Sequence, residues 1–179
     1  MKMRFLSNIR WKNLATAAGL WVAITLIDQM VKLLVVSNLK PYLDYPVIGN
    51  FFKLTLVYNK GILFGIKLFP SEMSWLYPTV MIVIMALVIF ALVFEKTWPN
   101  TIAYGMILGG ALGNLIDRFR IGRVVDFLNF GIGDLRWPYF NLADSAVICG
   151  IFIIIVFSFR KKEEPEETTI ASDATPIKE

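Results

Sequence analysis

Four apolar segments constrain the fold of this chain more than any other feature of its sequence. A helix needs about 17–25 predominantly apolar residues to cross a bilayer. The third segment is short and rich in small residues, whereas the second carries no charge. With 56% hydrophobic residues overall, the chain suits a bilayer better than a soluble core. We therefore predict an all-α membrane protein with four transmembrane helices, at about residues 14–36, 75–94, 101–117 and 138–159.

The segment at about residues 41–70 does not have the pattern of a span. Between Tyr45 and Tyr58 it mixes β-branched and aromatic residues with polar ones, which indicates one or two short strands, and Gly49-Asn50 is a plausible turn. A small extracytoplasmic β-sheet between the first and second helices is the expectation. Residues 1–160 then form one polytopic membrane domain, and residues 161–179 are predicted to be a disordered cytoplasmic tail.

Basic residues near the first apolar segment predict the orientation. Lys2, Arg4, Arg10 and Lys12 precede it, and only Lys40 follows it closely, so the N-terminus is predicted to be cytoplasmic. Four spans then return the C-terminus to the cytoplasm. The two expected outer segments also carry lysines and arginines, which weakens the rule. The first segment is too long for a signal-peptide core and lacks a small-x-small cleavage site, so it is expected to remain as a span.

The composition excludes several kinds of enzyme. The chain has no histidine and one cysteine, Cys149. A Ser/His/Asp triad, a Cys/His pair and an HExxH zinc site all need histidine, and a cysteine zinc site needs several cysteines. Carboxylates, a Ser/Lys pair or a carboxylate-bound metal remain for hydrolysis; no metal or cofactor is expected. No basic run with interleaved aromatic residues occurs, so nucleic-acid binding is not expected.

Ionisable residues within the apolar segments are candidates for function, because charge is costly in a bilayer. Asp28 and Lys32 lie four residues apart and share a helix face, which favours a structural ion pair. Asp117 adjoins Arg118 at the end of the third segment, and an interfacial salt bridge between them is the simplest interpretation. Asn114, one turn earlier, is able to hydrogen-bond on the same face.

Asp126 and Asp144 form the strongest candidate pair. Asp126 lies among apolar residues without an adjacent base, and Asp144 lies near the start of the last segment, eighteen residues later. The predicted topology places both at the outer ends of spans three and four. Two carboxylates in contact share a proton, which suits acid–base hydrolysis of a peptide. The alternatives left open are that Asp126 caps a helix and that Asp144 bonds Asn141.

Two other patterns indicate a catalytic site less strongly. Gly131-Ile132-Gly133-Asp134 has the G-x-G-D pattern of another class of intramembrane aspartyl protease, but it lies in a short loop and is interpreted as a turn. Ser145 with Lys32 offers a histidine-free Ser/Lys mechanism. Since Asp28 would keep Lys32 charged, that lysine would be a poor base.

Five ordered blocks between Asp28 and Ser145 resemble bacterial lipoprotein signal peptidase, also called signal peptidase II. The blocks are Asp28-Gln29 with Lys32, Asn59-x-Gly61-x-x-Phe64-Gly65, the run from Gly109 to Arg118, Gly122-x-Val124-Val125-Asp126-Phe127, and Phe140-Asn141-x-Ala143-Asp144-Ser145. One departure is that Ile62 and Leu63 stand where the family usually has two alanines. Bulkier side chains there would narrow the pocket or change how inhibitors fit.

The resemblance implies an aspartic endopeptidase of the bacterial inner membrane, with both termini cytoplasmic and the site near the outer face. Its substrate would be a diacylglyceryl-modified prolipoprotein, cut before the lipidated cysteine, and globomycin would inhibit it. The catalytic dyad would be Asp126 and Asp144. The residues that would line or support the site are Asn59, Gly61, Asn114, Arg118, Asn141 and Ala143.

Further expectations accompany this hypothesis. Membrane lipids are expected as partners and the chain is expected to be a monomer. Small residues at 109–113 would allow close helix packing, and residues 59–65 would clamp the substrate peptide. The rival classes are a transporter or proton-relay subunit, for which Asp28 and Lys32 would matter most, and a structural membrane scaffold, for which no single aspartate would matter beyond stability.

Overall fold

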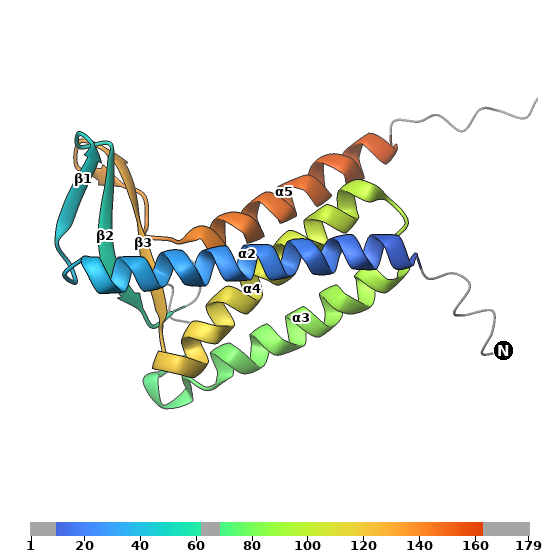
Figure 1. The fold of residues 1–179 in the computed structure, drawn as a ribbon, viewed down its shortest axis with the longest axis horizontal. Coiled ribbons are helices and arrows are strands. Elements are labelled where there is room, and N and C mark those ends of the chain that lie inside the picture. The colour runs from blue at the N-terminus through green and yellow to red at the C-terminus, as the bar shows by residue number, and fades with distance from the viewer. Residues whose placement is uncertain (1–9, 62–68, 163–179) are drawn as a thin grey trace, which may run out of the picture.

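The computed structural model describes residues 10–61 and 69–162, and it forms a helical bundle with a sheet at one end (Figure 1). The helices are α2 (Trp11–Asn38), α3 (Leu76–Phe94), α4 (Trp98–Ile121) and α5 (Leu142–Lys162). A short 3-10 helix, η2 (Ser71–Met73), precedes α3. Four long helices therefore form where four apolar segments were predicted. The expected disordered tail and the substitutions Ile62 and Leu63 lie almost entirely outside the described residues.

Three of the helices are long and apolar enough to cross a membrane: α2, α3 and α5 over Leu142–Phe159. The fourth, α4, has 24 residues and so a length of about 36 Å at 1.5 Å per residue. It extends beyond the predicted 101–117 at both ends and carries Asp117, Arg118 and Arg120 in its last turns. Helix α4 packs against α2, α3 and α5, so its small and polar residues face protein on several sides.

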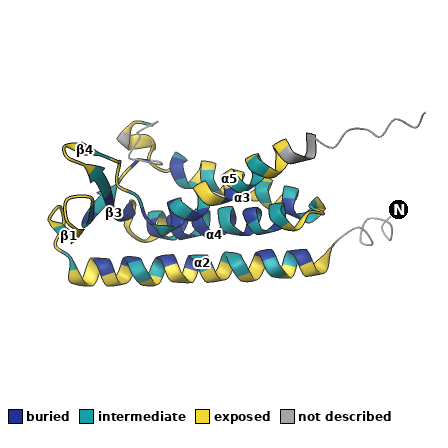
Figure 2. Ribbon diagram, turned by 90° about the horizontal axis from the view of Figure 1, so that it is seen from above, coloured by how far each residue is buried: buried dark blue, intermediate teal, exposed yellow. Residues whose placement is uncertain are grey.

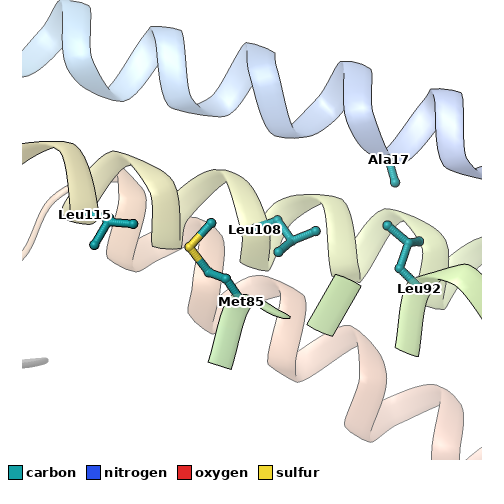
Figure 3. Packing of buried hydrophobic residues seen from close by; sticks show 5 residues of the cluster. All are labelled: Ala17, Met85, Leu92, Leu108 and Leu115. Carbon is teal, nitrogen blue, oxygen red and sulfur yellow. The ribbon is translucent and has the colours of Figure 1, made fainter. Parts of the chain in front are cut away.

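The bundle core lies around α4. Leu108 and Leu115 of α4 meet Ala17 of α2 and Met85 and Leu92 of α3 in one buried cluster (Figure 3). Outside this cluster the arrangement is the reverse of a soluble protein, since large apolar side chains cover the outer helix faces. Figure 2 shows the exposed residues of α2 on the side turned away from the other helices. Such faces suit contact with acyl chains.

Glycines let α4 approach its neighbours closely, as the small residues predicted. A Cβ atom on Gly109 would lie 2.8 Å from the Ile24 Cβ of α2. On Gly110 it would overlap the backbone carbonyl oxygen of Ala143 at the start of α5, and on Gly113 it would lie 2.6 Å from an Asp28 carboxylate oxygen. These contacts bring three helices together directly beneath the sheet.

The sheet has four antiparallel strands in the order β1 (Asp44–Ile48), β2 (Phe52–Asn59), β3 (Val124–Ile132) and β4 (Leu135–Arg136). The turn predicted at Gly49-Asn50 joins β1 to β2, and Gly49 has φ +50°. The G-x-G-D segment ends β3 and forms the turn to β4, with Gly133 at φ +59°. Its interpretation as a turn is confirmed for Gly133-Asp134, whereas Gly131 and Ile132 pair with β4 as the end of β3.

The prediction that the sheet lies only between the first two helices was incomplete. Strands β3 and β4 come from the connection between α4 and α5, and β2 pairs with β3 along most of its length. The run Val124 to Leu128, in which four of the five residues are apolar, forms the first part of β3. Val35 of α2 packs with Leu56, Val125 and Phe127 of the sheet, so the sheet is fixed to the end of the bundle.

Candidate active site

Asp126 lies on β3, which pairs with β2, and is almost completely buried, with 1% of its surface exposed. One carboxylate oxygen accepts a hydrogen bond from Asn59 Nδ2 at 2.9 Å, and the other accepts one from Asn141 Nδ2 at 2.7 Å. The aspartate does not cap a helix, which removes that alternative. Two amide donors instead fix the orientation of its carboxylate.

Asp144 lies in the first turn of α5 and is also buried. Its carboxylate accepts hydrogen bonds from Asn114 Nδ2 at 2.8 Å and from the backbone N–H of Asn141 at 3.4 Å. In return, the backbone N–H of Asp144 donates to Asn141 Oδ1 at 2.9 Å. This reciprocal pair has the pattern of a helix N-terminal capping box. The predicted bond between Asp144 and Asn141 is present, and it holds the carboxylate at the start of the helix.

The side chain of Asn141 joins the two aspartates. Its Nδ2 lies within hydrogen-bond distance of Asp126 Oδ1, at 2.7 Å, and of Asn114 Oδ1, at 3.1 Å. Its Oδ1 and its backbone N–H bind Asp144 as described. Asn141 is fully buried. One rigid amide therefore brings the strand aspartate and the helix aspartate to the same place.

A second polar cluster supports this arrangement from within the bundle. Lys32 Nζ lies 2.8 Å from the Asp28 carboxylate and 2.9 Å from the Asp117 carboxylate, and it donates to Asn114 Oδ1 at 2.9 Å. The predicted ion pair between Asp28 and Lys32 is thus present. The predicted pair of Asp117 with Arg118 is wrong. On a helix adjacent side chains point in different directions, and Asp117 turns inward to Lys32.

The carboxylates of this cluster also hold the backbone that carries the two aspartates. Asp117 Oδ2 accepts the N–H of Val125, the residue before Asp126, at 3.1 Å. Asp28 Oδ1 accepts the N–H of Ala143, the residue before Asp144, at 3.0 Å. Both carboxylates, which share Lys32 as their cation, therefore hold the backbone beside the candidate site without belonging to it.

Arg118 of α4 and residues 59–61, at and just after the end of β2, border the site. Arg118 donates to the carbonyl oxygen of Gly61 at 2.7 Å, and the N–H of Gly61 donates to Asn59 Oδ1 at 2.7 Å. Since Asn59 also binds Asp126, a chain of hydrogen bonds runs from α4 to β3. All of the residues predicted to line or support the site lie in this region. Of the proposed clamp, Asn59, Lys60 and Gly61 are described and the remaining residues lie outside the description.

An open cavity of about 330 Å³ adjoins Asp144. Its polar end is formed by Asp144, Asn59, Asn114 and Arg118. Its walls are apolar side chains from α3, α4 and α5: Val80, Met81, Ile84, Ile107, Ala111 and Val147. A ligand in this cavity would have an apolar portion among the helices and a polar portion against the candidate site.

The electrostatics of the site favour a shared proton. Burial, and then the neighbouring charge of Asp144, raise the pKa of Asp126 to about 7. A carboxyl group with such a pKa keeps a proton near neutral pH, when an exposed aspartate would be ionised. The arrangement can therefore present one ionised and one protonated carboxyl group together.

The other candidates do not assemble into a site. Ser145 Oγ donates to the backbone carbonyl oxygen of Asn141 at 3.0 Å, and Lys32 binds two carboxylates and Asn114. No hydrogen bond joins serine and lysine in the described part of the chain. Asp134 is exposed in the β3–β4 turn, away from the helices. Among residues 10–61 and 69–162, no group of three acidic or cysteine side chains is arranged to hold a metal ion.

The fold and the site together define a polytopic membrane enzyme with a buried pair of carboxyl groups beneath a small sheet. Residues 20–160 match the family model described as Signal peptidase (SPase) II, and the chain belongs to this family. Family members are peptidases that process lipoproteins, and the helical architecture fits a membrane enzyme.

Relatives support the assignment over most of the chain. A lipoprotein signal peptidase of Halothermothrix orenii is 41% identical over 140 residues, which cover 78% of this chain and 92% of the relative. One from Xylella fastidiosa strain M12 is 37% identical over 152 residues, covering 81% and 89%. Two solved bacterial membrane enzymes have similar folds. The first has a TM-score of 0.78 at 24% identity, covering 96% of this chain and 98% of that one. The second has a TM-score of 0.73 at 27% identity, covering 86% and 97%.

Proposed function

We propose that this chain removes signal peptides from diacylglyceryl-modified prolipoproteins, with Asp126 and Asp144 as its catalytic dyad. The observation that carries the proposal is that one buried amide, that of Asn141, binds both aspartates beside an apolar cavity. Family membership supports the substrate class.

In the proposed mechanism, a water molecule lies between the two carboxyl groups. The ionised aspartate takes a proton from this water as the water attacks the scissile carbonyl carbon. The protonated aspartate donates a hydrogen bond to the carbonyl oxygen and stabilises the developing oxyanion. The proton then passes to the leaving nitrogen and the peptide bond breaks. Which aspartate begins protonated is a property of the coupled pair.

The cavity suggests how the substrate enters. Its apolar walls come from α3, α4 and α5, so a signal helix and acyl chains would reach it laterally from the lipid. Its polar end would receive the peptide bond before the lipidated cysteine. Globomycin would compete for the same space.

The proposed topology has four spans, with α4 as the third, in the bacterial inner membrane. Its support is the length of α4 and its position between the three more apolar helices. The basic residues before α2 favour cytoplasmic termini, and the sheet and the dyad would then lie at the outer face. We also propose that the enzyme acts as a monomer.

The test is a gel-shift cleavage assay with purified protein in lipid and a diacylglyceryl-modified prolipoprotein. We expect the wild type to cut and Asp126→Asn and Asp144→Asn to lose nearly all activity while remaining folded. Asp134→Asn is the matched control, because it removes an exposed aspartate of the same sheet and also tests the G-x-G-D alternative. Intact substrate with the wild type, or normal cleavage by both dyad variants, would contradict the proposal.

The transporter alternative is distinguished in the same assay by Asp28→Asn. If Asp28 and Lys32 form a proton path, their loss abolishes transport and the wild type cuts no peptide. If the chain is a peptidase, we expect the Asp28→Asn variant to cleave slowly and to unfold at a lower temperature than the wild type. The reason is that Asp28 binds the backbone N–H of Ala143, the residue before Asp144, and does not contact the dyad itself.

A further inference from the structure

A second open cavity, of about 310 Å³, lies on a different side of the bundle from the candidate active site. It is formed where the C-terminal ends of α2 and α4 meet β2 and β3, at the sheet end of the molecule (Figure 1). The residues that line it are Lys32, Leu33, Val36, Tyr58, Asp117, Arg120, Ile121, Arg123 and Val125. Neither Asp126 nor Asp144 is among them, and the volume falls at the lower end of the range for ligand sites.

The cavity carries a net positive charge. Lys32, which lines the cavity with Asp117, lies 2.9 Å from Asp117 and 2.8 Å from Asp28, so this cluster adds no positive charge to the cavity. Arg120 and Arg123, both exposed, then remain as two guanidinium groups, and Asp117 is the one acid among the described residues that line the cavity. An anion is therefore the complementary ligand.

The two arginines are held in place but keep donors for a ligand. Arg120 donates from one nitrogen to Gln29 Oε1 at 3.3 Å. The Arg123 guanidinium carbon lies 5.1 Å from the centre of the Tyr58 ring, and its Nε reaches the carbonyl oxygen of Ile121 at 3.5 Å. Since a guanidinium group has five N–H donors, each has capacity beyond these contacts. Guanidinium groups match the geometry of phosphate oxygens.

The rest of the cavity is apolar and open toward the region expected to hold lipid. Leu33 and Val36, on the outer face of α2, are 53% and 42% exposed, and Ile121 of α4 is 42% exposed. These side chains line the same cavity as the two arginines. A ligand that fits both parts has an anionic head and an apolar chain.

We propose that this cavity binds one anionic phospholipid, with its phosphate on Arg120 and Arg123 and an acyl chain along Leu33 and Val36. Basic pockets between transmembrane helices bind anionic head groups on the cytoplasmic side of membranes, and the same pairing of guanidinium and phosphate groups applies to this cavity. The lipid would fill the gap between α2 and α4 next to Lys32 and Asp117, and so would stabilise the end of the bundle that carries the sheet. This site is separate from the proposed peptidase site, and its test uses no cleavage readout.

The experiment is native mass spectrometry of the delipidated protein in detergent with an equimolar mixture of phosphatidylglycerol and phosphatidylcholine. We expect the wild type to retain one phosphatidylglycerol in preference to phosphatidylcholine. Arg120→Gln/Arg123→Gln should weaken phosphatidylglycerol binding by about tenfold or more, because two charge-assisted contacts are lost. Val36→Trp, which fills the apolar part and leaves both arginines, should weaken it as well.

The matched control is Lys12→Gln/Lys96→Gln, which removes two exposed cations at the opposite end of the bundle. It should bind phosphatidylglycerol like the wild type. Equal binding of the two lipids by the wild type would overturn the proposal without any variant. Unchanged binding by the arginine variant, or equal weakening by the control, would also overturn it. If soluble glycerol phosphate displaced the lipid and Val36→Trp had no effect, the cavity would be a phosphate site rather than a lipid site.

Discussion

At the scale of single residues, one asparagine contacts both aspartates of the proposed dyad. The Asn141 side chain binds the Asp126 carboxylate of β3 and the backbone N–H of Asp144 in α5, and the Asn141 backbone N–H binds the Asp144 carboxylate. Asn141 thus holds near each other two groups that repel when both are ionised. The sequence predicted the two aspartates, and family resemblance predicted that Asn141 supports them. Its role as a bridge depends on the relative position of a strand and a helix.

The first prediction concerns pH. Because the pKa of Asp126 is raised to about 7, the proton held by the pair is present below that pH and is lost as the pH rises through it. We expect kcat/KM to fall above pH 7, approaching about tenfold per pH unit, since no carboxyl group then remains to donate to the scissile carbonyl. A profile measured between pH 5 and 9 checks this.

The control for this profile is Asp44→Asn. Hydrogen bonds from Thr55 and Lys53 lower the pKa of Asp44, so this group stays ionised throughout the range. Its removal should leave the shape of the profile unchanged. A wild-type profile that is flat from pH 6 to 9 would show that the pair loses no proton there.

The second prediction separates the dyad from a serine nucleophile. Ser145 Oγ bonds only to the backbone oxygen of Asn141 among the contacts of the described residues. Ser145→Ala should therefore keep kcat within about threefold of the wild type, whereas loss of a true nucleophile reduces kcat by about 10⁶-fold. Steady-state cleavage of the prolipoprotein measures it. A loss approaching that size would favour the Ser/Lys mechanism.

At the scale of elements, α4 is the organising helix of the bundle. It contacts the three other helices, and its glycines allow backbone contacts that larger residues would prevent. The charged residues Asp117 and Arg118 of α4 were predicted from the sequence to mark the end of a short span. In the structure the same residues continue the helix to Ile121, and Asp117 contacts Lys32 inside the bundle. The helix ends where Gly122, with φ +69°, takes the left-handed conformation typical of a C-terminal cap.

The third prediction tests this packing. A methyl group on Gly110 would overlap the carbonyl oxygen of Ala143 and lie 2.8 Å from Val147 Cγ2. Gly110→Ala should destabilise the protein by about 1–3 kcal/mol, because α4 and α5 must move apart. The unfolding temperature in detergent should fall, and activity should fall with it, since Ala143 adjoins Asp144.

Gly19→Ala is the matched control, because a Cβ there meets no atom within 4 Å. Alanine in a helix is more stable than glycine by about 0.5–1 kcal/mol, so this variant should unfold at the same temperature or a higher one. Equal loss of stability in both variants would contradict the packing argument.

At the scale of the whole molecule, large apolar side chains cover the outer helix faces, and charged side chains are buried between the elements. The buried charged residues lie in the C-terminal half of α2, the last turns of α4, β3 and the first turn of α5: Asp28, Lys32, Asp117, Asp126 and Asp144. Each has partners there, as burial of charge requires. The end of the bundle away from the sheet carries the α3–α4 connection and the start of α2, where Arg10 donates to the carbonyl oxygen of Lys96.

The fourth prediction concerns topology. In a Cys149→Ser background, Asn50→Cys lies in the β1–β2 turn and Lys96→Cys lies in the connection between α3 and α4, and both positions are exposed. A membrane-impermeant maleimide should label Asn50→Cys in intact spheroplasts and Lys96→Cys only after permeabilisation. The reverse pattern would show that the termini lie outside.

The sequence by itself determined the kind of protein and its main chemical groups. Runs of apolar residues and the cost of burying charge are properties of local sequence, so the four helices, the pair Asp28–Lys32 and the candidates Asp126 and Asp144 could all be predicted. The tertiary structure alone decided that β3 joins the sheet, that Asp117 pairs with Lys32 instead of Arg118, and that Asn141 bridges the two aspartates. These contacts join residues far apart in the chain, and they depend on the rotation and register of the packed elements, which residue spacing does not specify.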